Sequence, residues 1–167
     1  MRTYIQIDME NQVEYIFVKS SDKELVNAIY QILFRCGIKM AKQFLFHWIP
    51  PYSKRAILKA CDTKYVVIVK DNGLNAFTST FQMSVQDDKS LYVGKIATDP
   101  KFEGRGIGKT NMLFMEQFAK GKGCSSIKLD VYDKSKRAVR FYERNGFEIV
   151  GEKRSVRFKE LIMSKRL

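Results

Sequence analysis

Three glycines fall within five residues in the segment Gly104-Arg105-Gly106-Ile107-Gly108, between a predicted strand and a predicted helix. The first turn of a helix has backbone N–H groups without internal partners, and the helix dipole adds positive potential at the same end. Glycine lets a phosphate approach such a turn without meeting a Cβ atom. The segment therefore predicts an anion site that suits a pyrophosphate.

The segment departs from two familiar glycine-rich phosphate loops. A P-loop would end as Gly108-Lys109-Thr110 does, but it needs glycine at the position of Glu103. A Rossmann loop needs a further glycine at position 109 or 111, and neither residue is glycine. For three glycines alone, a tight strand-to-helix turn without a ligand is the alternative interpretation.

A second motif runs from Ser135 to Phe147. Together with positions 103–108 and the preceding run from Ile96 to Pro100, it resembles the GNAT superfamily of N-acetyltransferases. The hallmarks of that family are Arg/Gln-x-x-Gly-x-Gly/Ala at a strand-to-helix turn and Asn-x-x-Ala-x-x-Phe-Tyr-x-x-x-Gly-Phe further along the chain. The close match covers about residues 91–151.

The resemblance implies acetyl-CoA as cosubstrate and a primary amine, on a small molecule or a peptide, as acceptor in a ternary complex. Tyr142 occupies the family's general-acid position, where a phenol would protonate the leaving thiolate. The alternative for Tyr142 is simple packing between its helix and the sheet. A backbone N–H in the strand before the glycine turn would stabilise the oxyanion. The residues that would bind acetyl-CoA are Ile96, Ala97, Thr98, Gly104, Arg105, Gly106, Ile107, Gly108, Lys109, Thr110, Ser135 and Tyr142.

Two residues depart from the family pattern. Glu103 replaces the usual arginine or glutamine, and a carboxylate repels a pyrophosphate. We therefore expect the side chain of Glu103 to make no phosphate contact or to turn to solvent. Ser135 replaces the usual asparagine, and its hydroxyl still suits a hydrogen bond to the cofactor and the cap of a helix.

The group that deprotonates the attacking amine is not evident from the sequence. An alkyl ammonium has a reference pKa near ~10.4, so a base or a water chain must take its proton. The strand 91–98 contains no carboxylate, which leaves Asp99, Glu103 and His47 as candidates. The aromatic-rich stretch from Phe44 to Tyr52 would suit either the wall of an acceptor site or the core.

Local patterns predict the elements that position these segments. We expect strands at 13–18, 65–70, 74–85, 91–98, 126–132, 147–150 and 158–165. We expect helices from a capping box at Ser21 and Glu24 to about Cys36, ended by Gly37, and then at 40–48, 53–59, 105–120 and from Ser135 to Asn145.

These elements predict one α/β (α+β) domain over residues 1–167. Asn72-Gly73 suits a tight hairpin turn, so the early strands should be antiparallel. The helix between strands 91–98 and 126–132 makes those two strands parallel. The expected fold is a GNAT-like mixed, mostly antiparallel sheet of about six or seven strands with helices on both faces.

The formal net charge of +12 favours anionic partners. A basic nucleic-acid-binding module is therefore one alternative function, and a catalytically inactive acetyl-CoA sensor is another. Because the basic residues are spread along the chain, we expect no nucleic-acid partner.

Hydropathy and ligand-type residues limit the other classes of function. No apolar run reaches ~18 residues and no secretory signal is evident, so we expect a cytoplasmic protein without a membrane partner. Three scattered cysteines and the single histidine, His47, lack the spacing of metal ligands, so we expect no metal. The family resemblance is compatible with a homodimer.

Overall fold

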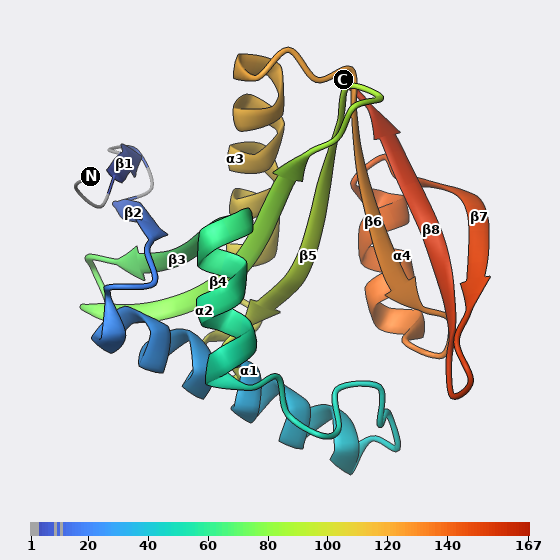
Figure 1. Ribbon diagram of the computed structural model, residues 1–167, viewed down its shortest axis with the longest axis horizontal. Coiled ribbons are helices and arrows are strands. Elements are labelled where there is room, and N and C mark those ends of the chain that lie inside the picture. Colours follow the sequence, from blue (N-terminus) through green and yellow to red (C-terminus); the bar gives the residue numbers. More distant parts are fainter. Residues whose placement is uncertain (1–3, 9, 11) are drawn as a thin grey trace. The chain divides into compact units, whose positions relative to one another are not determined.

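The computed structural model describes residues 4–8, 10 and 12–167 (Figure 1). The chain forms two compact units, which are residues 1–83 with 95–107, and residues 84–94 with 108–167. We refer to them as the first and the second unit. The strands are hydrogen-bonded in the order β1-β2-β3-β4-β5-β6-β8-β7, and β4 (Ala76–Val85) and β5 (Ser90–Thr98) contribute residues to both units.

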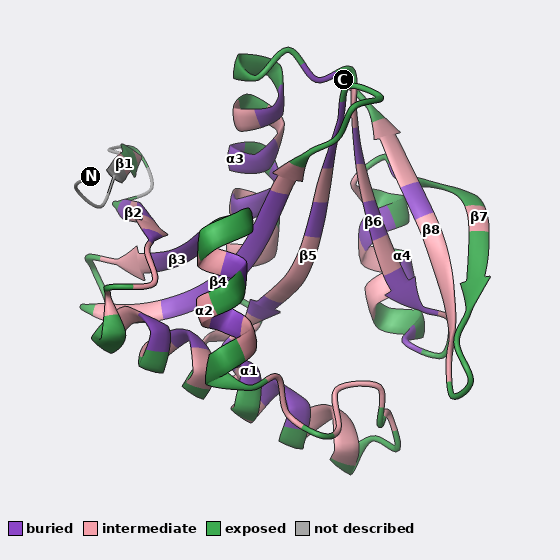
Figure 2. Ribbon diagram, in the orientation of Figure 1, coloured by how far each residue is buried: buried purple, intermediate pink, exposed green. Residues whose placement is uncertain are grey.

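The first unit contains an antiparallel sheet with two helices on one face. Its strands include β1 (Tyr4–Asp8), β2 (Val13–Val18), β3 (Tyr65–Asp71) and most of β4. The helices α1 (Lys23–Lys42) and α2 (Lys54–Thr63) lie over this sheet, and Figure 2 shows buried residues along the strands and on one side of each helix.

A helical stripe of apolar residues attaches these helices to the sheet. In α1 the buried residues recur three or four apart, which places them on one face, and Ile57 and Ala60 do the same in α2. Ser53 caps α2, because its hydroxyl accepts from the backbone N–H of Ala56 at 3.2 Å. The cluster formed by the helices and the sheet consists of Ile16, Val18, Val26, Ile29, Ile32, Leu33, Cys36, Ile57, Ala60, Val66, Ile68 and Ala97.

The second unit combines parallel and antiparallel pairing. The first half of β5 runs parallel to β6 (Ser126–Tyr132), and β8 (Lys159–Arg166) pairs antiparallel with both β6 and β7 (Glu148–Arg154). The helix α4 (Lys136–Arg144) and all but the first residue of α3 (Ile107–Gly121) also belong to this unit.

The observed fold confirms the predicted class, which is a mixed, mostly antiparallel sheet accompanied by helices. The predicted ranges of β2 and β6 are those observed, and the predicted parallel pairing of β5 with β6 is confirmed. The described residues contain eight strands rather than six or seven. None of their helices is sufficiently long and apolar to cross a membrane.

The predicted start and end of the first helix were wrong. Asp22 rather than Ser21 precedes α1, and the Asp22 carboxylate accepts from the backbone N–H of Lys19 at 3.0 Å instead of capping the helix. The helix continues through Gly37, where an added Cβ would lie 3.4 Å from the Trp48 carbonyl oxygen. A Cβ at this distance would make an ordinary contact, so Gly37 lies inside the helix without ending it and without an evident need for glycine.

The predicted helix at 40–48 was also wrong. The first turn of that segment belongs to the end of α1, and residues 43–53 form a loop in which Phe44 has a φ of +60°. The Asn72-Gly73 pair lies in a four-residue turn, 72–75, where Asn75 rather than Gly73 adopts a positive φ.

Candidate functional site

A β-bulge interrupts β5 just before the residues Ile96–Thr98. The backbone N–H of Asp99 donates to the carbonyl of Thr78, and near the hairpin turn the backbone N–H of Gln86 donates to the carbonyl of Ser90. Between these two hydrogen bonds, the β5 side of the pair contains one residue more than the β4 side. Lys95 has a φ of +50° there, which is unusual for a residue with a side chain. Bulges re-aim side chains and are frequent beside active sites.

The glycine turn adopts a backbone conformation that requires glycine. A short 3₁₀ helix, Pro100–Phe102, follows β5, and then Gly104 and Gly106 both have a φ of +78°. Apart from the adjoining residues of the chain, no described heavy atom lies within 4 Å of a Cβ built on either glycine, so the space beside this turn is open. The helix α3 begins directly afterwards at Ile107, and its first N–H groups lie at the end of this turn.

The helix α1 holds the start of the glycine turn through two adjacent residues. The Sγ of Cys36 lies 3.1 Å from the carbonyl oxygen of Thr98. The guanidinium of Arg35 donates to Asp99 Oδ2 from Nη2 at 2.5 Å and from Nε at 3.1 Å. Asp99 is only 1% exposed, and its other oxygen accepts from the Lys101 backbone N–H at 3.1 Å. The lead-in to the turn is therefore fixed to a helix by partly buried polar contacts.

Glu103 pairs with a lysine of the same helix. One turn beyond Arg35, the ammonium of Lys39 bonds to the carboxylate of Glu103. The side chain of Glu103 is therefore directed to α1, and Lys39 offsets its negative charge. Burial, together with Asp99 and Glu103, raises the pKa of the Cys36 thiol to about 12, so this thiol remains neutral.

In the second unit, the start of α3 packs against α4. A Cβ added to Gly108 would lie 3.0 Å from Cζ of Phe141, so glycine allows the two helices to approach closely. Ser135 is the N-terminal flanking residue of α4 and is 9% exposed, but its side chain makes no capping hydrogen bond, contrary to the predicted cap. Its hydroxyl therefore remains available for another partner.

Tyr142 is buried on the inner side of α4. Its side chain is 9% exposed, and its ring lies 5.3 Å from that of Phe141 and 5.7 Å from that of Phe147 between centroids. Burial raises the pKa of the Tyr142 phenol above its ordinary value, so the group stays protonated at neutral pH. Val139 is the other buried residue that α4 contributes among the described residues.

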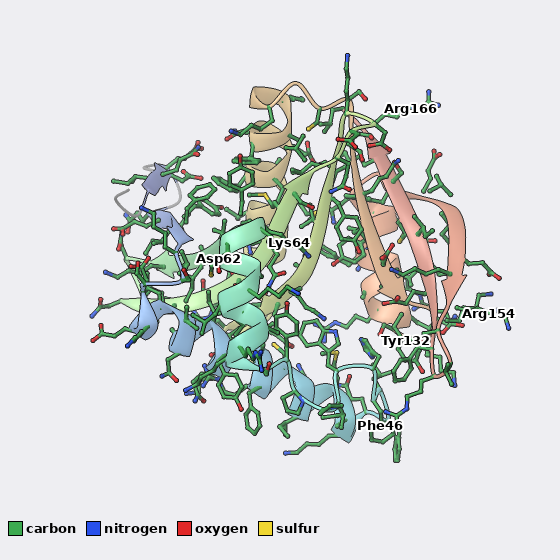
Figure 3. The ribbon with its side chains drawn as sticks, in the orientation of Figure 1. Phe46, Asp62, Lys64, Tyr132, Arg154 and Arg166 are labelled. Carbon is green, nitrogen blue, oxygen red and sulfur yellow. The ribbon has the colours of Figure 1, made fainter. Side chains whose placement is uncertain are left out.

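The aromatic-rich loop divides into a packed part and an exposed part. Trp48 and Tyr52 pack against the core of the first unit, whereas Phe44 and Phe46 are 82% and 50% exposed. Figure 3 shows Phe46 on the loop that follows α1. The ammonium of Lys95 lies over both packed rings, at 5.5 Å from the Trp48 centroid and 4.7 Å from the Tyr52 centroid.

The three candidate bases lie in the first unit under different electrostatic conditions. Burial, and secondarily the charge of Lys95, lowers the pKa of His47 to about 4, so its imidazole is neutral at physiological pH. Asp99 and Glu103 are instead paired with cations of α1.

A polar network beside the half of β5 that pairs with β6 was not predicted from the sequence. The Tyr92 hydroxyl donates to Asp130 Oδ2 at 2.6 Å, and the ammonium of Lys153 bonds to the same oxygen. The contacts from Arg35 and Lys39 were missed as well. Their spacing of four residues predicts a shared helix face, but nothing in the sequence identifies their partners 64 residues away.

The chain matches a family model and two curated relatives in sequence. The family model described as "Acetyltransferase (GNAT) family" matches residues 26–147. Thialysine N-epsilon-acetyltransferase of Bos taurus is 32% identical over 72 residues, which are 43% of this chain and 42% of that protein. The Sus scrofa protein of the same name is 33% identical over 66 residues, or 40% and 39%. The chain thus matches less than half the length of these curated relatives.

Two solved structures have a similar fold at low sequence identity. The ribosomal-protein-S18-alanine N-acetyltransferase of Escherichia coli gives a TM-score of 0.72 at 17% identity, covering 92% of this chain and 93% of that one. The PaiA N-acetyltransferase of Thermoplasma acidophilum, in complex with coenzyme A, gives 0.74 at 17% identity, covering 93% and 99%. Among the described residues, no group of three or more His, Cys, Asp or Glu is placed to hold a metal ion.

Proposed function

The chain belongs to the acetyltransferase (GNAT) family, and from this premise we propose that it transfers the acetyl group of acetyl-CoA to a primary amine in a ternary complex. The observation that carries the proposal is the glycine turn. Gly104 and Gly106 hold left-handed conformations beside open space, immediately before the N-terminus of α3. Such a turn presents several backbone N–H groups to one anion.

In this proposal, acetyl-CoA contacts two backbone segments. The N–H groups of residues 104–110 bind the pyrophosphate, and the exposed cations Arg105 and Lys109 add charge near it. The backbone of Ile96–Thr98, which follows the bulge, pairs with the pantetheine arm, and Ser135 offers it a hydroxyl. The pair of Lys39 with Glu103 explains how the family's arginine or glutamine is replaced without a free negative charge beside the phosphates.

The chemistry requires one nucleophile and two proton transfers. The amine nitrogen attacks the thioester carbonyl, a C–N bond forms, and a backbone N–H of β5 stabilises the oxyanion. When the C–S bond breaks, the thiolate takes a proton, and Tyr142 holds one at neutral pH because it is buried. The proton of the amine leaves through a base or through water.

Names of related proteins support an amine acceptor. The curated relatives are named for the ε-nitrogen of thialysine, and a solved structure with a TM-score of 0.69 is a spermidine N-acetyltransferase chimera. We propose a small-molecule or peptide amine for this chain, a cytoplasmic location and no nucleic-acid partner, with a homodimer as a compatible assembly.

A specific observation favours a second candidate, which is a catalytically inactive acetyl-CoA sensor. Tyr142 lies between two aromatic rings. If its side chain serves only to pack there, the protein would bind acetyl-CoA without a general acid for catalysis. Cofactor binding alone therefore does not distinguish an enzyme from a sensor.

A ligand series followed by a turnover assay tests the proposal. Because a ligand that binds only the folded chain raises its stability, acetyl-CoA and CoA should raise the Tm while ATP should not. Thiol release over a panel of amines should then show transfer. No Tm shift with either coenzyme would refute the cofactor, whereas a shift without release on any amine would identify a sensor.

A further inference from the structure

Gln82 carries a buried amide that is not satisfied by the protein. It lies in β4 directly opposite Val66, which belongs to the core under α1 and α2, so its side chain is on the helix-covered face. The residue is 4% exposed, and within the described part of the chain its Nε2 has no hydrogen-bond partner. Native structures rarely leave such a donor unpaired, so a ligand or a water is required to explain it.

Lys95 is the neighbour of Gln82 across the strand pair. The hydrogen bond from Asp99 to Thr78 indicates the register of β4 and β5, and counting from it along both strands we infer that Lys95, at the bulge, lies beside Gln82. Ala97, which follows the bulge in β5, lies in the core under α1 and α2.

Aromatic rings hold the Lys95 ammonium on that face. Its Nζ lies 5.5 Å from the Trp48 ring centroid and 4.7 Å from that of Tyr52, and both residues pack against the core of the first unit. Attraction of a cation to the faces of these rings limits where the ammonium can lie. The positive φ at Lys95 is the local distortion that turns its side chain to this position.

The chemistry of these groups matches an anion. The amide Nε2 of Gln82 is a hydrogen-bond donor, so the group that satisfies it is an acceptor, and the positive charge of Lys95 favours one that is charged. The flanking rings supply apolar walls for the carbon skeleton that bears it.

We propose that Gln82 and Lys95, flanked by Trp48 and Tyr52, form a subsite for an anionic group of the acceptor. The chain would then acetylate amines that also carry a carboxylate or a comparable oxyanion, such as amino acids. This inference rests on the proposed acetyl transfer and names its acceptor class.

The charged side chains at the end of β5 and just after it favour acceptors with an anionic group over purely cationic amines. A polyamine would bring further positive charge to Lys95, at a like-charge cost. The carboxylates of Asp99 and Glu103 already pair with Arg35 and Lys39 of α1.

The test compares amines that differ only in a carboxylate. Lysine with cadaverine and phenylalanine with phenethylamine form such pairs, and their binding to the CoA-saturated protein is measured by calorimetry, which needs no turnover. We expect the carboxylate-bearing member of each pair to bind at least about tenfold more tightly. Equal binding, tighter binding of the decarboxylated member, or no binding of either pair would overturn the subsite.

Variants connect this preference to the named residues. Gln82→Met and Lys95→Met should each reduce the preference to about threefold or less, Lys95→Arg should retain it, and Gln82→Glu should reverse it. Lys59→Met, which removes one exposed positive charge from α2, is the matched control and should retain it. An unchanged preference in the Gln82 and Lys95 variants would show that the amide is merely packed or bound to water.

A parallel thiol-release assay separates this inference from the proposed function. Loss of transfer on every amine, with the binding preference intact, would refute acetyl transfer but leave the anionic subsite standing. Transfer to both members of each pair with equal kcat/KM would support acetyl transfer and refute the subsite.

Discussion

At the scale of the residue, Tyr142 combines a buried phenol with a position on the inner side of α4. Because burial raises its pKa, it carries a proton at neutral pH. We predict that Tyr142→Phe lowers kcat by about 10²-fold and changes the KM for acetyl-CoA less than about twofold. The Tm should hardly change, since the ring contacts with Phe141 and Phe147 remain. Steady-state thiol-release kinetics decide, and an unchanged kcat would remove Tyr142 from the mechanism.

His47 gives a prediction about stability and pH. Its pKa is about 4 in the folded chain and returns to about 6.5 on unfolding, so below pH 6.5 the unfolded chain binds a proton that the folded chain does not. The folded state should therefore lose stability as the pH falls from about 6.5 to about 4. Urea midpoints measured at pH 7 and pH 5 should fall more in the wild type than in His47→Asn. Parallel losses in both proteins would contradict this assignment.

At the scale of the element, α1 offsets the charge of the glycine turn. Lys39→Met would leave the Glu103 carboxylate beside the proposed pyrophosphate, so we predict that the KM for acetyl-CoA rises about three- to tenfold. Glu103→Gln alone should lower that KM, and the double variant should lie near the wild type. Steady-state kinetics on the four proteins form a double-mutant cycle. A double variant whose KM stays as high as that of Lys39→Met would show that Lys39 does not act by offsetting the charge of Glu103.

At the scale of the whole molecule, the net charge of +12 should assist the encounter with a polyanionic cofactor. We predict that raising the ionic strength from about 0.05 M to about 0.5 M slows acetyl-CoA association several-fold, because added salt shortens the range of the charges. Stopped-flow binding at both salt levels measures this, with ATP as a control for non-specific attraction of phosphates. An association rate independent of salt would show that the charge serves another purpose.

The fold and the cofactor turn could be predicted because their signals are local. Alternating apolar residues predicted β6 to the residue, and Gly104, Gly106 and Gly108 marked the turn before α3. Local rules failed at Gly37, which lies inside α1 although glycine is typical of the end of a helix. They could not find the partner of Glu103, because the contact with Lys39 exists only after the chain folds.

The bonds between α1 and the glycine turn also predict how cofactor binding changes local motion. Cys36, Arg35 and Lys39 bond to three residues between Thr98 and Glu103, so a ligand that immobilises this stretch also suppresses the fraying of α1. Saturation with acetyl-CoA should slow amide hydrogen exchange in residues 35–42, with residues 13–18 unchanged as the reference. Slower amide exchange in α1, a helix without any proposed contact to the cofactor, would thus be a measure of cofactor binding.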